Sequence, residues 1–478
     1  MLNNIRLNRL GAGHRRIALY IVTATGILLL AAAIGFILPR LSTKLSVLLL
    51  AGIVGLGVVL YLAEKPELSL VLLLLGAFFI PLEISATAAV SVNVVIFIVL
   101  VIAGLWIAQG LRHRQIQIVQ SRTMVPMLVF LIVAAISWLY GNASWDIRFP
   151  RPTNLLFVQA GQYAIFILSF IAYFIAAQQP QKVLRWITFG FIILGALAIF
   201  ARYGGILGRP FQLVLTDAAG NGSFYVWFTA LAASQAIFNR QLKTQWRYGL
   251  IIAAILVPLL GFFFSASWTS SWLPPVFVLL FLIWLRSRFS AGFLVGLIVI
   301  FVISGLVFRF FDWEFERELS VGGRLILWEA VWNLAKTQPI LGLGLTTYHQ
   351  YHTFIPLLTE HGAWYTPNVN SHNLYLDIFA QMGIVGLAVF VWLAAEIGAQ
   401  TWRLRQRFSN DFNSAYVAGA FAGLVGTLIA SGIAEWMLPF VYNVGLKGFR
   451  FSVFIWIFLG GLVILEKSPL IGNKEPTD

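Results

Sequence analysis

Residues 371–386 read Ser-His-Asn-Leu-Tyr-Leu-Asp-Ile-Phe-Ala-Gln-Met-Gly-Ile-Val-Gly, and within them a long polar stretch of the chain gives way to an apolar one. The apolar stretch continues to about residue 400, which is long enough for a helix to cross a bilayer about 30 Å thick. His372 therefore stands where a loop enters a membrane span. That boundary decides the fold expected on either side and the place where chemistry is expected.

Composition determines the class of protein. Of the 478 residues, 60% are hydrophobic and 10% are charged, and the mean hydropathy is +0.87, whereas soluble domains carry about 25% charged residues. Apolar runs of about 18 residues recur along the chain, and backbone groups in lipid must be paired within the span, so the spans are helices. The sequence contains no cysteine, which excludes disulfide and thiolate chemistry. We predict an all-α, polytopic helical bundle in a membrane.

Hydrophobic segments number fourteen, but the third is short and the tenth contains Pro274-Pro275, so a count of twelve or thirteen stays open. With the N-terminus in the cytoplasm, 20 of the 32 Lys and Arg residues fall in inner segments, as the cytoplasmic excess of basic residues requires. This topology accounts for the net charge of +14 without nucleic acid, and it places both termini inside. The segments are 17–38, 44–63, 68–82, 90–109, 123–140, 155–177, 183–203, 223–239, 248–265, 270–285, 290–308, 373–400, 414–433 and 446–465.

The spans divide the chain into three predicted regions. Residues 1–308 form an N-terminal bundle of about eleven spans, 309–372 form a long outer loop, and 373–478 contain the last spans and a short cytoplasmic tail. A transporter would more often show matched halves with interrupted helices near the midplane, and the sequence has no clear internal repeat. We expect the chemistry in the outer loop.

An interfacial helix is predicted within this loop at residues 324–337. Gly322-Gly323 and Pro339 are suitable boundaries. Arg324 would stand at the helix N-terminus, where free N–H groups favour an anion and a guanidinium adds a fork suited to phosphate. An interfacial arginine that merely reaches lipid headgroups fits the spacing equally well. One oily helical face is formed by apolar side chains at 325, 328, 331, 332 and 335.

Four of the six histidines, His349, His352, His361 and His372, fall within 24 residues. His349 and His352 are three residues apart and could act as a pair of zinc ligands, but no nearby carboxylate or thiolate completes a site, so we expect no metal. His372 can be neutral at external pH and accept a proton. The alternative is a histidine that only forms hydrogen bonds at a helix start.

Two motifs resemble those of a known family. His372-Asn373 followed by Gly383 and Gly386 resembles the histidine signature of the O-antigen ligase/polymerase superfamily of bacterial membrane glycosyltransferases. From the residues alone, the two glycines permit close helix packing. The resemblance covers about residues 200–400. It extends to the approach to the histidine, Arg324…Trp328…Pro339…Gly342-Leu-Gly344…Tyr348, and to Arg209 followed by Asn221 before a helix.

The resemblance implies an activity. Members of the family transfer a glycan from an undecaprenyl-pyrophosphate carrier to a hydroxyl acceptor, without metal, cofactor or nucleotide sugar. They do so on the outer, periplasmic face of the bacterial cytoplasmic membrane. It therefore implies a metal-independent, inverting glycosyltransferase with His372 as catalytic base and with Arg209 and Arg324 on the pyrophosphate. Tyr348 and Asn373 belong to the matching motifs and are additional candidates. The implied partners are the lipid-linked donor, a lipid A core or glycan acceptor, and membrane lipids.

The sequence departs from the family at one point. A Ser-Arg pair is frequent there at the outer end of the helix that precedes the long loop, but here Trp268 stands in the arginine's place. A missing phosphate ligand would have to come from Arg202, Arg309 or Arg317.

Several functions remain compatible with these residues. An O-antigen ligase and an O-antigen or exopolysaccharide polymerase differ only in the acceptor, and related proteins transfer glycans to protein. A transporter or flippase of a lipid-linked sugar would also present outer arginines to pyrophosphate. A transporter does not need a base at His372, so the histidine distinguishes these classes.

Overall fold

The computed structural model describes residues 55–85, 91–114, 119–216, 220–264, 269–287, 322–352, 357–358, 364–365 and 371–467. The chain consists of two compact units, Met1–Lys65 and Pro66–Asp478. The described part of the first unit contains the helix Gly55–Glu64. The predicted spans 17–38 and 290–308, together with Arg309 and Arg317, lie outside the described residues.

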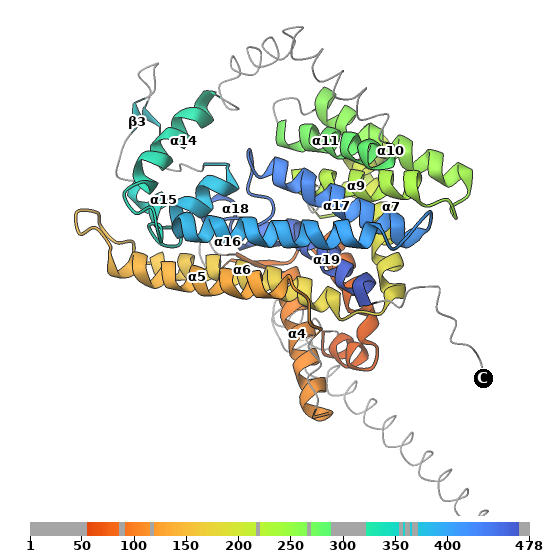
Figure 1. The fold of residues 1–478 in the computed structure, drawn as a ribbon, viewed down its shortest axis with the longest axis horizontal. Coiled ribbons are helices and arrows are strands. Elements are labelled where there is room, and N and C mark those ends of the chain that lie inside the picture. The colour runs from red at the N-terminus through yellow and green to blue at the C-terminus, as the bar shows by residue number, and fades with distance from the viewer. Residues whose placement is uncertain are drawn as a thin grey trace, which may run out of the picture. The chain divides into compact units, whose positions relative to one another are not determined.

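Helices make up nearly all of the described second unit (Figure 1). Two short antiparallel pairs of strands accompany them: β1 (Glu83–Ser85) pairs with β2 (Ser91–Asn93), and β3 (Leu357–Leu358) with β4 (Trp364–Tyr365). The helices are η2 (Pro66–Leu68), α3 (Ser69–Phe79), α4 (Val94–Arg112), α5 (Met124–Ala143), α6 (Leu155–Ala177), α7 (Gln181–Tyr203), α8 (Gly205–Gln212), α9 (Gly222–Phe238), α10 (Thr244–Phe264), α11 (Thr269–Arg286), α14 (Gly322–Ala335), α15 (Thr347–His352), α16 (Leu374–Arg405), α17 (Phe412–Ala430), α18 (Val441–Val444), η4 (Leu446–Gly448) and α19 (Phe449–Lys467).

Eight of the described helices are long and apolar enough to cross a membrane. They are α4, α5, α6, α7, α10, α16, α17 and the stretch Leu446–Lys467 that contains α19. α3 and α11 are shorter apolar helices. α9 has 17 residues, almost all of them buried, and it packs against α10, α11 and α17. The predicted all-α, polytopic membrane architecture is confirmed.

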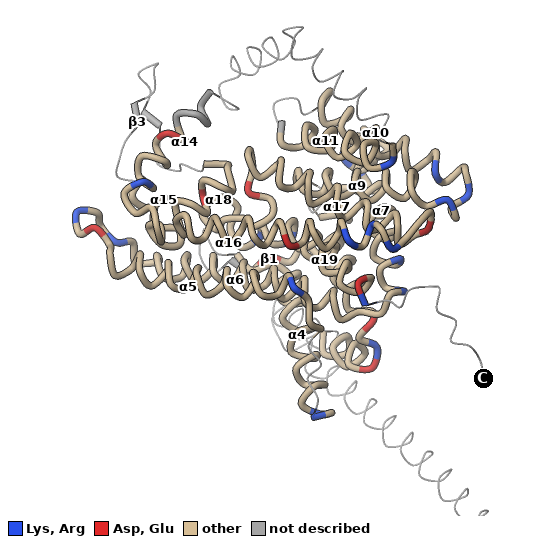
Figure 2. The backbone as a smooth tube through the Cα atoms, viewed as in Figure 1, with Lys and Arg blue, Asp and Glu red and all other residues tan. Residues whose placement is uncertain are grey.

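Several long helices of the second unit lie side by side, so this unit has two ends (Figure 1). At one end, Lys182 lies 2.6 Å from Glu67, and Arg405 donates to the Leu285 carbonyl at 2.5 Å. Figure 2 shows many Lys and Arg residues around this end, which we call the basic end. The opposite end holds the C-terminus of α5, helices α14, α15 and α18, and the start of α16 (Figure 1). We call it the α14 end.

The helix that follows His372 is interrupted. α16 begins with the Asn373 side chain accepting hydrogen bonds from the Tyr375 and Leu376 amides at 3.1 and 3.2 Å. At Gly383 the backbone turns to φ 64° and ψ −166°, so α16 consists of two helical pieces. Gly383 therefore does more than allow close packing, which was its expected role. An interrupted helix exposes backbone N–H and C=O groups that lipid cannot satisfy.

A segment from the predicted outer loop satisfies them. Residues 339–344 lie against the interruption, where the Leu343 amide donates to Ala380 O at 2.8 Å and the Ile384 amide donates to Pro339 O at 2.8 Å. The approach is backbone to backbone, since a Cβ at position 383 would lie 2.7 Å from the Gly342 nitrogen and would overlap Ile340 O. This contact holds the outer loop on the first part of α16.

Gly383→Ala should lower the free energy of unfolding by more than about 2 kcal/mol, because it adds a Cβ to a left-handed residue with no free space. Gly398→Ala is the matched control in the same helix. Its Cβ would meet nothing within 4 Å, so it should be neutral or stabilising by roughly 0.5–1 kcal/mol. Unfolding in mixed detergent micelles would measure both, and equal stability of the two variants would contradict the proposed role of the contact.

Candidate active site

His372 is held in an unusual backbone conformation at the α14 end. Its φ is 49°, in the left-handed region that non-glycine residues rarely occupy outside functional sites. Ser371 bridges the turn, because its hydroxyl accepts from the Asn373 amide at 3.0 Å. Trp328 of α14 donates its indole N–H to Ser371 O at 2.6 Å. These contacts fix the backbone at His372, while its side chain stays 39% exposed.

One nitrogen of the imidazole faces protein. Nδ1 lies 3.5 Å from Oε2 of Glu435, whose side chain is 2% exposed, and 3.4 Å from Nδ2 of Asn443. Asn443 also donates to Oε1 of Glu435 at 2.7 Å. Within the residues that the structure describes, both polar contacts of the ring are made through Nδ1. Nε2 is therefore the nitrogen available to a substrate.

A buried layer of hydroxyl groups, those of Tyr348 and Tyr442, lies close to His372, Glu435 and Asn443. The Tyr348 hydroxyl donates to Asp377 Oδ1 and lies 2.6 Å from the Tyr442 hydroxyl. His349 stacks on the Tyr442 ring with centroids 4.7 Å apart. Burial, and after it the Asp377 carboxylate, raises the pKa of both phenols well above their ordinary value. The two tyrosines therefore stay neutral and can donate hydrogen bonds at physiological pH.

A helix, α14 (Gly322–Ala335), is present where the interfacial helix 324–337 is predicted. Val331 and Ala335 on its apolar face are buried, and Trp332 stacks on Phe379 of α16 with centroids 5.1 Å apart. Arg324 occupies the third position of α14. It lies four residues before Trp328, so the two positions share a helix face one turn apart. The position of Arg324 is therefore about one turn from the residue that contacts the His372 loop.

Two other candidate arginines lie where α7 ends. Arg209 lies on α8 and is exposed. Arg202 lies in the last turn of α7, with its guanidinium 5.7 Å from the Tyr203 ring centroid. It lines a cavity of about 300 Å³ together with Gln212, Thr216 and Gly220. Because α7 starts at the basic end, its C-terminus and both arginines lie toward the α14 end.

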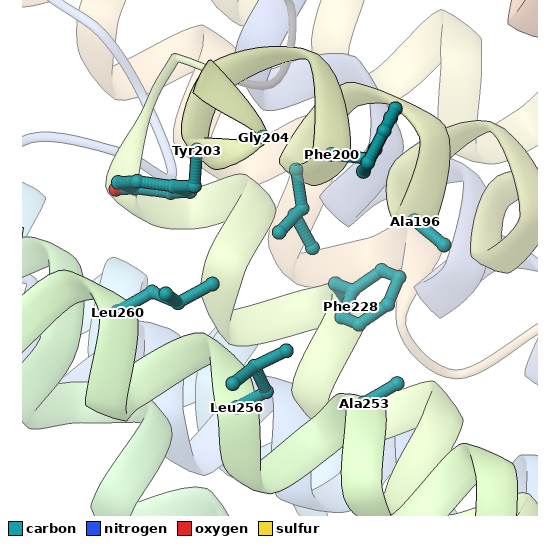
Figure 3. A pocket seen from close by; sticks show the side chains of 9 residues that line it. Ala196, Phe200, Tyr203, Gly204, Phe228, Ala253, Leu256 and Leu260 are labelled. Carbon is teal, nitrogen blue, oxygen red and sulfur yellow. The ribbon is translucent and has the colours of Figure 1, made fainter. Parts of the chain in front are cut away.

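An apolar cavity of about 280 Å³ opens beside these arginines, between α7, α9 and α10. Figure 3 shows its lining side chains around a common space. Phe200 and Leu256 are 42% and 45% exposed, so the cavity can be reached from the outer surface of the helices. It is lined by Ala196, Ile199, Phe200, Tyr203, Gly204, Phe228, Ala253, Leu256 and Leu260.

The first turn of α9 lies between the segment that carries Arg202 and Arg209 and the loop that carries Glu435. The Asn221 side chain accepts from the Ser223 amide at 2.9 Å and caps the helix. A Cβ at Gly222 would lie 2.9 Å from Nε1 of Trp436, the residue after Glu435. The Asn221-Gly222 turn therefore touches the loop that carries Glu435.

The structure thus gathers several of the candidate residues at one end. His372, Asn373 and Tyr348 lie in one cluster, although the Tyr348 hydroxyl is already bonded to Asp377 and Tyr442. No group of three His, Cys, Asp or Glu side chains suited to a metal occurs among the described residues, while His361 and the side chain of His352 lie outside them. Sequence reasoning missed Glu435 and Asn443. The usable signal was an acidic residue within the otherwise uncharged stretch 431–446.

Tyr348→Phe should cost about 1–3 kcal/mol in free energy of unfolding, since it leaves buried polar partners without the shared hydroxyl. Tyr163→Phe is the control. The Tyr163 hydroxyl donates to the Leu131 carbonyl at 3.3 Å, is half-buried, and should matter less. A loss for Tyr348→Phe no larger than for Tyr163→Phe, in the same unfolding assay, would argue against a cooperative hydroxyl layer.

Comparison with known protein families agrees with this picture. Residues 253–391 match the family model described as O-antigen ligase, and this range includes α14, Arg324 and His372. A comparison with curated proteins finds no match to the chain. The family match confirms the resemblance of the histidine motif to the O-antigen ligase/polymerase superfamily over residues 253–391, and with its apolar helices the chain is an integral membrane protein.

Proposed function

We propose that the protein transfers a glycan from undecaprenyl pyrophosphate to a hydroxyl acceptor at the α14 end of the bundle, as an O-antigen ligase does. The observation that carries the proposal is the environment of the His372 imidazole. Its Nδ1 faces Glu435 and Asn443 while the ring remains partly exposed beside the α14 position of Arg324. A base and a site for an anion are then next to each other.

The reaction needs few groups. An acceptor hydroxyl loses its proton to Nε2 of His372 as its oxygen attacks the anomeric carbon of the donor glycan. The pyrophosphate leaves with the bonding electrons, and arginines stabilise the developing charge in place of a metal. A single displacement of this kind inverts the anomeric configuration. We assign the pyrophosphate to Arg324 and Arg209, with Arg202 as a further ligand.

The basic residues support an orientation across the membrane. Lys and Arg gather at the basic end (Figure 2), as expected for the cytoplasmic side. α19 ends there, as the hydrogen bond that Arg407 donates to Glu466 O at 2.7 Å shows. We therefore propose that the α14 end and its loop region 309–372 face the periplasm, with both termini in the cytoplasm.

The apolar cavity suits the donor's lipid. It extends from Ala253, in the middle of α10, to Tyr203 and Gly204 at the end of α7 (Figure 3). Arg202 directly precedes Tyr203 in the chain, and Arg209 follows Gly204 on α8. A polyprenyl chain in the cavity would place its pyrophosphate among those arginines. Ligase and polymerase share this donor and differ only in the acceptor, so a polymerase of the same family is the alternative.

His372→Ala should reduce glycan transfer in a reconstituted assay with lipid-linked oligosaccharide by about 10²–10⁴-fold, the usual contribution of a general base. His113→Ala, at an exposed histidine that caps the end of α4, should keep the wild-type rate. Carrier binding should survive in both. Wild-type turnover of His372→Ala would remove the base role, and carrier translocation without transfer by the wild type would favour a flippase.

Ala253→Phe should weaken binding of the lipid-linked donor roughly tenfold, because the ring occupies the space proposed for the chain. Ile252→Phe is the control, since Ile252 is the adjacent residue of α10 and is 63% exposed. Titration of each variant with a polyprenyl-pyrophosphate donor would measure the effect. Equal affinities would place the chain elsewhere.

A further inference from the structure

We propose that Glu435 is a positioning residue for His372, which holds the proton on Nδ1 and so leaves Nε2 bare to accept the proton of the acceptor hydroxyl. This inference rests on the base role proposed above. It adds a residue outside the matched range 253–391 and assigns a tautomer to the base.

The geometry around Nδ1 selects the tautomer. An ionised carboxylate only accepts hydrogen bonds, so the nitrogen that faces Oε2 of Glu435 at 3.5 Å is best protonated. Asn443 presents its NH₂ group to Oε1 at 2.7 Å, and the reverse orientation would set its carbonyl against the carboxylate. Its contact with Nδ1, at 3.4 Å, is about as long as that of the Glu435 oxygen with Nδ1, so charge decides between them, because a carboxylate attracts an N–H group more strongly than a neutral amide attracts a bare ring nitrogen. The Asn443 amide therefore donates to Glu435, and the Glu435 carboxylate faces the Nδ1–H of His372.

The loop that carries Glu435 is tied down on both sides. Ser431 O accepts from the Leu374 amide at 2.8 Å, two residues after His372. Met437 O accepts from the Trp456 indole at 3.0 Å. Glu435 and His372 are thus anchored to each other through the start of α16. A side chain held this way can orient an imidazole, as the third member of a catalytic triad does.

Acidic and phenolic groups lie close to the Glu435 side chain. Asp377, Tyr348 and Tyr442 each interact electrostatically with Glu435. Within the described part of the chain, the basic side chain within 4 Å of Glu435 is His372. A buried carboxylate is costly unless it is paired. The imidazolium formed when Nε2 takes a proton would add a positive charge next to this carboxylate, which already accepts a hydrogen bond from Asn443.

The proton and electron pairs balance in this scheme. The acceptor O–H bond breaks as its proton forms a bond to Nε2, and the oxygen lone pair forms the new glycosidic bond. The bond from the anomeric carbon to the phosphate oxygen breaks, and its electrons leave with the pyrophosphate. Glu435 keeps no proton and forms no covalent bond. His372 then returns the Nε2 proton to water or to the departing phosphate.

The test is transfer kinetics with a lipid-linked oligosaccharide. Glu435→Gln should lower kcat by about 100-fold or more with the KM for donor nearly unchanged. Glu435→Asp should recover part of the rate. Glu466→Gln, which removes a carboxylate bonded to Gln400 at 2.7 Å at the basic end, should match the wild type.

A double-mutant comparison separates positioning from folding. In the His372→Ala background, Glu435→Gln should cause little further loss, because its effect acts through the imidazole. Additive losses, or a Glu435→Gln enzyme with the wild-type rate, would overturn the inference and leave the base role standing. An active His372→Ala enzyme would instead overturn the proposed function itself. Thermal unfolding of Glu435→Gln near the wild-type temperature is expected, and collapse of the fold would also contradict a positioning role.

Discussion

The contact between residues 339–344 and the interruption of α16 at Gly383 is the constraint on which the site depends. A broken helix in a membrane must have its free backbone groups paired by protein. Here the loop segment pairs them, with Leu343 and Ile384 as donors. The glycines at 342 and 383 make the approach possible, because side chains at either position would overlap the opposing backbone. This contact holds α14 beside the first half of α16, together with the stacking of Trp332 on Phe379 and the hydrogen bond from Trp328 to Ser371 O.

The position of His372 follows from that arrangement. The first half of α16 carries Asn373, which caps it, and Asp377, which takes the Tyr348 hydroxyl. α14 adds the indole of Trp328, which binds the residue before the histidine. Three elements distant in sequence therefore hold one imidazole in a left-handed turn. Rigid support of this kind is what a catalytic group needs if it is to meet its substrate at a fixed angle.

Toward the α14 end, acidic side chains are buried in the protein, and the candidate arginines lie at its surface. Asp377 and Glu435 are buried, whereas Arg209 is exposed and Arg202 lines a cavity. A base must gain positive charge as a diphosphate leaving group gains negative charge. In the proposed reaction, the buried acids near the histidine would stabilise the charge that it gains, and the arginines would stabilise the charge of the leaving group. The apolar cavity between α7, α9 and α10 is the space that we propose for the lipid chain of the donor.

Much of this was predictable from the sequence, because the relevant physics is local. Bilayer thickness sets the length of an apolar run, so segments such as 155–177 were recognised with the bounds that α6 has. The 3.6-residue period identified the helix that became α14, and the change from polar to apolar residues drew attention to His372. The interruption at Gly383 was missed, since a glycine in an apolar run also suits close packing.

The sequence by itself determined the class of protein, the spans, and the boundary at which the histidine stands, because hydropathy and helical period act over a few turns of chain. Only the tertiary structure decided which groups surround that histidine. Glu435 and Asn443 lie 63 and 71 residues further along, and pairing over that distance depends on how the helices pack. It also decided that residues 339–344 pair with the broken helix, because hydrogen bonds between backbones leave no pattern in the side chains.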